Sequence, residues 1–146
     1  MCIRDRSIGA LRAKGISDRA ILRSLHFFAD NERVVSQVAA LRGNDFDEFK
    51  RLIVESGYSS YMYLKNVFSC INPAEQGIAL ALALTENMLE GRGAWRVHGG
   101  GFAGTMQAFV PVELLEDYKT MIEAAMGEGK CHVLSIRPVG GIKVEA

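Results

Sequence analysis

Residues 94–111, AWRVHGGGFAGTMQAFVP, decide the fold of this chain. A glycine-rich run, residues 99–104, separates two short segments that carry valine, tryptophan, threonine and phenylalanine, which favour strands. Residues 94–98 therefore predict a strand that enters a turn, and residues 105–111 predict the strand that leaves it. Because the connection is so short, the two strands are expected to pair antiparallel.

Upstream of this hairpin, apolar residues recur at helical spacing. Ser17 or Asp18 can cap a helix that Gly43 stops. The charged stretch 30–33 interrupts the apolar face, so the pattern allows either one long helix or two shorter ones. The apolar positions are Ile21, Leu22, Leu25, Phe28, Val35, Val38 and Leu41.

Two further helices are expected before the hairpin. Asn44 can cap one that ends near Gly57. The serine, tyrosine and asparagine residues that follow predict a loop as far as Asn72, with room for one helical turn. Asn72-Pro73-Ala74-Glu75 then has the pattern of a helix start, with an N-cap, a proline at the first helical position and a glutamate three residues after the cap. The apolar run after it predicts a helix that stops at Gly91.

The segment after the hairpin predicts one more helix and one more strand. Pro111 begins a helix with a single apolar face, and Gly127 and Gly129 end it. Residues 131–137 alternate as a third strand, and residues 140–144 form a frayed end. Residues 7–146 are thus expected to form one α+β domain, in which helices pack on a small, at least partly antiparallel sheet.

Composition excludes several classes of function. The chain has 146 residues, and its 17 basic residues cancel its 17 acidic ones, which argues against binding to nucleic acid or to an anionic membrane. No apolar run reaches the roughly 18 residues of a membrane span, and the N-terminus lacks the apolar core of a signal peptide. The three cysteines are far apart, which favours a reducing cytoplasm over a disulfide framework.

The first six residues, Met1 to Arg6 (MCIRDR), resemble translated adapter sequence at the ends of assembled reading frames. They are therefore left out of the predicted domain. On this interpretation the natural protein begins further upstream, and the chain is a fragment of it.

The glycine turn has several possible roles. Its glycines allow positive φ and expose backbone amides, which suits either a tight hairpin turn or a small anion site. Gly99, Gly101 and Gly104 match the GxGxxG dinucleotide fingerprint, but that motif needs a helix directly after it, and a strand is predicted there. The string HGGGF matches the oxyanion hole of esterases, but no GxSxG nucleophile motif follows it.

A third match covers most of the chain. Residues 93–104, GAWRVHGGGFAG, resemble the third conserved motif of galactokinases, in the GHMP kinase superfamily. Residues 26–34, which end in DNERV, resemble an upstream helical motif of that family. Glu55-Ser56, Ser69-Cys70 and residues 133–138 follow in the family's order. Three positions depart from its pattern: His98, Ala103 and Gly57.

The resemblance implies a parent activity, the ATP- and Mg²⁺-dependent phosphorylation of galactose or a related sugar. It also implies that this is the C-terminal portion, inactive alone, because the acidic sugar-binding motif, the serine-rich phosphate loop and the catalytic aspartate of the family's N-terminal half are absent from this sequence. No residue of this chain is therefore expected to be catalytic. The turn would form a wall near the substrate and phosphate through Gly99, Gly100, Gly101, Phe102, Ala103 and Gly104, with Phe102 packed into the core.

Other residues carry weaker signals. His26, His98 and His132 share no metal-binding spacing, so no metal site is expected. Trp95 and the tyrosines at 58, 61 and 63 favour packing over ligand contact. Cys70 is expected to be a buried thiol. The alternative to a kinase fragment is a self-sufficient α+β module that binds a small anion or has a regulatory role.

Overall fold

The computed structural model describes residues 5–102 and 104–136, with side chains from Ser7 onward. Its helices are α1 (Asp5–Ala13), α2 (Asp18–Arg42), α3 (Phe46–Ser59), α4 (Gly77–Leu89) and α5 (Leu115–Met126). A π-helical turn, Ser60–Leu64, extends α3, and a 3-10 turn, Val112–Leu114, precedes α5. The strands β1 (Ala94–Val97) and β2 (Met106–Phe109) lie between α4 and α5. The predicted α+β class is confirmed.

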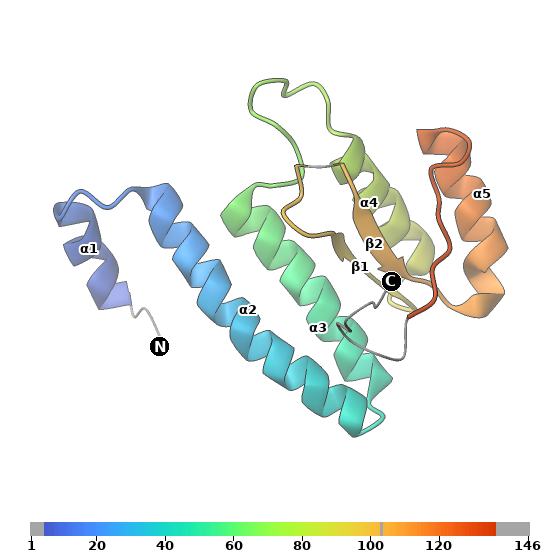
Figure 1. Ribbon diagram of the computed structural model, residues 1–146, viewed down its shortest axis with the longest axis horizontal. Coiled ribbons are helices and arrows are strands. Elements are labelled where there is room, and N and C mark those ends of the chain that lie inside the picture. Colours follow the sequence, from blue (N-terminus) through green and yellow to red (C-terminus); the bar gives the residue numbers. More distant parts are fainter. Residues whose placement is uncertain (1–4, 103, 137–146) are drawn as a thin grey trace, which may run out of the picture.

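The two longest helices, α2 and α3, run side by side in opposite directions (Figure 1). The stretch 18–42 forms one helix rather than two, and Ser17 caps it by accepting a hydrogen bond from the Ala20 amide. The charged residues that interrupt its apolar face do not break it, because Asp30 and Arg33 bind partners on α3.

The hairpin forms as the sequence predicts. β1 and β2 pair antiparallel, with Ala94 opposite Phe109 and Val97 opposite Met106. Helices α3 and α4 both pack on β1, and α5 packs on α4 (Figure 1). The main core cluster lies where the sheet meets α4 and α5, and it contains Leu89, Trp95, Tyr118 and Ile122.

Two predicted helix starts are wrong. Asp45, not Asn44, caps α3, since its carboxylate accepts a hydrogen bond from the Glu48 amide while Asn44 has a φ of 55°. The segment after Asn72 forms a turn closed by the Glu75 amide and the Asn72 carbonyl, and α4 begins only at Gly77. The capping pattern there lies in a turn, because asparagine and proline favour turns as well as helix starts.

The predicted end of α3 near Gly57 lies within two residues of the observed end at Ser59. The helix continues through this glycine, and β1 crosses it closely: a Cβ on Gly57 would lie 3.0 Å from the Arg96 Cβ and 3.1 Å from the Trp95 carbonyl oxygen. Gly57 therefore permits helix–strand packing and does not terminate the helix. The π-helical turn beyond it ends at Lys65, which has a left-handed backbone.

The predicted third strand does not form over residues 131–136, which carry no strand pairing in the structure. Val133, Leu134 and Ile136 are exposed, so the alternating pattern has no neighbouring strand to pack it within the part of the chain that is described. Residue 137 and the predicted frayed end, 140–144, lie outside the described residues.

Over the described residues, no helix combines the length and the apolar character that a membrane crossing requires.

Candidate functional site

The glycine turn closes the hairpin at the end of β1. The His98 amide donates to the Thr105 carbonyl at 3.1 Å, and the Gly101 and Gly104 amides donate to carbonyls within the turn. Gly99, Gly101 and Gly104 have φ values of +57°, +88° and +82°, which only glycine adopts without strain. The sequence-predicted turn is therefore confirmed as a backbone feature.

Gly101 is the point at which the turn is anchored. A Cβ at this position would lie 2.1 Å from the backbone oxygen of Asn66, so no larger residue fits. The buried Asn66 side chain donates to the Gly100 carbonyl at 3.3 Å and accepts from the Ser60 hydroxyl at 3.1 Å. Asn66 thus ties the turn to the end of α3, whereas Gly99, Gly100 and Gly104 have open space around them.

Sequence reasoning missed this anchor, because Asn66 lies in a segment without periodicity. It also placed Phe102 wrongly. The Phe102 side chain is 59% exposed and does not pack into the core. The His98 ring lies at the surface, with its Nδ1 3.1 Å from the Gln107 Oε1. Ala103 lies outside the described residues.

A second polar cluster joins α2, α3 and β1. The Ser56 hydroxyl is fully buried, accepts from the Arg96 guanidinium at 2.7 Å and donates to the Asp30 carboxylate. Arg33 binds Asp30 at 3.3 Å and Glu55 at 2.8 Å. Residues far apart in the sequence therefore meet in one hydrogen-bonded network, which fixes the two helices and the strand relative to one another.

His26 lies at the edge of this network. Its Nδ1 is 3.0 Å from the Ser59 hydroxyl, and its Nε2 is 3.9 Å from the Asp30 carboxylate. Burial lowers the pKa of His26 below its ordinary value of 6.5; Asp30 opposes this shift, and Arg33 and Arg96 add to it. His26 is thus a neutral, structural side chain at neutral pH.

We expect the free energy of unfolding to fall as the pH drops through 6.5, because His26 binds a proton more readily in the unfolded chain than in the folded one. Glu55, whose pKa is lowered chiefly by its hydrogen bond from Arg33, adds a separate loss below pH 4.5. Urea unfolding at a series of pH values measures both steps. His26→Gln should flatten the first step alone, and an unchanged slope in that variant would contradict the assignment.

The remaining predicted residues do not join a common site. Trp95 belongs to the core and also lines a cavity with Tyr58 and Tyr61. Cys70 is exposed rather than buried. Over residues 5–102 and 104–136, no three histidine, cysteine, aspartate or glutamate side chains come close enough to hold a metal ion.

Comparison with known proteins gives one consistent result. The galactokinase of Mannheimia succiniciproducens is 28% identical over 125 residues, which are 82% of this chain and 31% of that protein. The galactokinases of Glaesserella parasuis and Actinobacillus pleuropneumoniae are each 28% identical, over 77% and 73% of this chain and 28% and 26% of their own lengths. The chain is similar to galactokinases. It spans about three tenths of these relatives.

No protein-family model and no solved structure matches the chain. The similarity to galactokinases is therefore a similarity to curated sequences alone.

Proposed function

We propose that this chain is the C-terminal part of an ATP-dependent sugar kinase, whose intact form transfers the γ-phosphate of ATP to galactose or a related sugar. The observation that carries the proposal is the similarity to three galactokinases over about three tenths of their length. The proposed activity belongs to the intact kinase. In it, this chain lines one side of the active site and supplies no catalytic residue.

The arrangement of the motif residues supports this proposal. The segments that resemble galactokinase motifs are separated by 20 to 40 positions in the sequence, and yet Asp30 and Arg33 contact Glu55 and Ser56, and Ser56 contacts Arg96. Arg96 lies in the strand that leads into the glycine turn. The network therefore links the helical motifs to the turn's own strand and holds the hairpin in place.

The turn itself offers backbone groups close to a ligand. Gly99 and Gly100 have no side chains and have open space around them, while Gly101 is fixed against Asn66. A rigid turn with exposed peptide groups suits a position beside a phosphate, since preorganised dipoles need no rearrangement when charge develops. In this proposal, ATP and Mg²⁺ are held mainly by the part of the kinase that this chain lacks.

One face of α2 is the proposed contact for the remainder of the kinase. This face carries exposed apolar side chains at spacings of seven, four and three residues, namely Phe27, Val34, Val38 and Leu41. The neighbouring Val35 is exposed as well. An exposed apolar stripe of this kind typically marks an interaction surface. About seven tenths of each relative's length lies outside the matched region. In this proposal, the corresponding part of the kinase covers the apolar stripe of α2.

The isolated 146-residue chain is expected to phosphorylate no galactose, whereas a reading frame extended upstream should do so with ATP and Mg²⁺. A coupled assay for ADP release measures both. Turnover of galactose by the pure chain would overturn the fragment assignment. An extended protein that folds, binds ATP and phosphorylates no sugar would overturn the kinase proposal itself.

A second candidate is a self-sufficient module that holds a small anion at the glycine turn, and the open space around Gly99 and Gly100 favours it. Inorganic phosphate or ATP should then raise the melting temperature of the isolated chain. An unchanged melting temperature in millimolar phosphate and ATP would exclude this candidate and leave the kinase fragment.

A further inference from the structure

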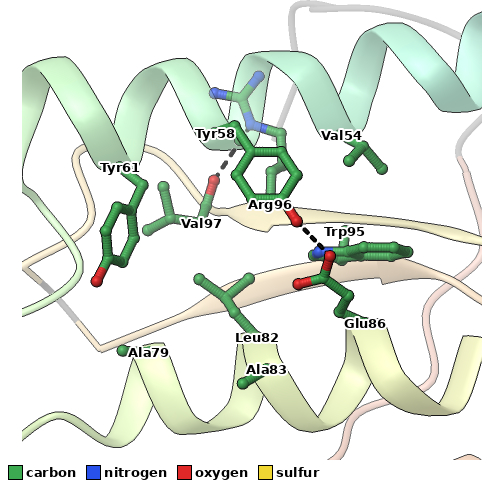
Figure 2. A pocket seen from close by; sticks show the side chains of 11 residues that line it. Val54, Tyr58, Tyr61, Ala79, Leu82, Ala83, Glu86, Trp95, Arg96 and Val97 are labelled. Carbon is green, nitrogen blue, oxygen red and sulfur yellow. Dashed lines mark hydrogen bonds between the residues drawn. The ribbon is translucent and has the colours of Figure 1, made fainter.

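A cavity of about 310 Å³ lies between α3, α4 and the face of β1. Figure 2 shows Tyr58 and Tyr61 on the α3 side, Leu82 and Ala83 on the α4 side, and Trp95 on the strand between the helices, next to Glu86. Most of the lining is apolar, and the two tyrosines are about half exposed, so the cavity opens to solvent along one side. This size and lining match the smaller pockets that proteins use for organic ligands.

The cavity lining includes one carboxylate, that of Glu86. Glu86 is the only acidic residue of α4, and it lies in the last turn of that helix, where the helix dipole adds negative potential. It accepts a hydrogen bond from the Tyr58 hydroxyl, and this bond is the main reason that the pKa of Tyr58 is raised. Over the described residues, Glu86 takes part in no ion pair.

The other charged group of the lining is already bound elsewhere. The Arg96 guanidinium donates to Ser56 and to the Val97 carbonyl, and Figure 2 shows it on the α3 side, turned away from Glu86. The open part of the cavity therefore combines tyrosine rings with one carboxylate that has no ion-pair partner among the described residues. Aromatic rings and a carboxylate together are the groups that attract an alkylammonium ion.

We propose that this cavity binds a small organic cation, a ring-sized apolar body that carries one ammonium group. The apolar body contacts Leu82, Ala83 and Trp95, and the ammonium lies beside the Glu86 carboxylate, against the adjacent ring of Tyr58. The proposal does not depend on the proposed kinase function, since every residue of the cavity belongs to this chain.

The single tryptophan of the chain reports binding directly, because Trp95 lines the cavity. Titration of the 146-residue chain with benzyltrimethylammonium should change the Trp95 emission and saturate. Neopentylbenzene has the same shape without the charge, and it should bind about tenfold more weakly. Equal affinity for the two probes, or no saturable change with either, would overturn the proposal.

Two variants and one control assign the site. Glu86→Gln should remove the tenfold preference for the cation and leave the affinity for neopentylbenzene unchanged. Ala83→Phe should fill the cavity and abolish binding of both probes, while Leu80→Phe, on the exposed face of the same helix, should change neither. If circular dichroism shows that Ala83→Phe does not fold, the test rests on Glu86→Gln alone. In that variant, an affinity ratio between the charged and the uncharged probe that stays at the value of the unmodified chain contradicts the proposal.

Discussion

Gly101→Ala is expected to lower the free energy of unfolding by about 3 to 5 kcal/mol, because it combines a strained backbone with a steric clash. The residue has a φ of +88°, and the added methyl group would lie 2.1 Å from the Asn66 backbone oxygen. That oxygen belongs to the main chain, so it cannot move aside as a flexible side chain does. Urea unfolding followed by circular dichroism measures the loss.

The two preceding glycines provide matched controls within the same turn. Gly100→Ala should be nearly neutral, since a Cβ there meets nothing and its φ is not positive. Gly99→Ala has open space but a φ of +57°, so it should cost about 1 kcal/mol from backbone strain alone. Equal losses at all three positions would show that the contact with Asn66 does not anchor the turn.

Arg33→Met is expected to destabilise the chain by about 2 to 3 kcal/mol, because it leaves two carboxylates without their shared partner. The Arg33 side chain is 14% exposed and binds both Asp30 and Glu55. Methionine retains most of the aliphatic stem, so the variant removes the charge more than the packing. The partial exposure of Glu55 keeps the expected loss below that of a fully buried pair.

Arg51→Met is the control for this experiment, since Arg51 also binds Glu55, at 2.9 Å. The Arg51 side chain is 58% exposed, and its loss should therefore cost clearly less than the loss of Arg33. Both free energies are read from the same urea unfolding curves. If the two variants lose the same amount, the network between α2 and α3 contributes no more than surface charge pairing.

Local rules predicted a large part of the fold. The helix cap at Ser17, the helical spacing of apolar residues up to Gly43 and the two short strands around the glycines all involve residues close in sequence. Such elements are stabilised mainly by neighbouring backbone and side-chain groups, which the sequence displays directly. The helix after Pro111 was predicted for the same reason, with one 3-10 turn at its start.

The errors occurred where distant parts of the chain meet. Gly57 has the pattern of a helix end and lies two residues before it, but only the structure shows that a glycine is needed there because β1 passes close by. The pattern at Asn72 suits a helix cap as well as a turn, and only the packing of α4 decides between them. The alternation in residues 131–136 predicts a strand, but a strand needs a neighbour to pair with.

The candidate sites, like the fold, were predicted from the sequence only where the residues involved are close in the chain. The sequence alone indicated that residues 99–104 form a glycine turn and that the chain is similar to galactokinases. Only the tertiary structure identified Gly101 as the anchored glycine and Asn66 as its partner, because that contact joins segments 35 positions apart. The structure alone also placed Glu86 beside Trp95 and Tyr58. Periodicity records which face of an element is buried, whereas the partner on that face depends on how the elements pack.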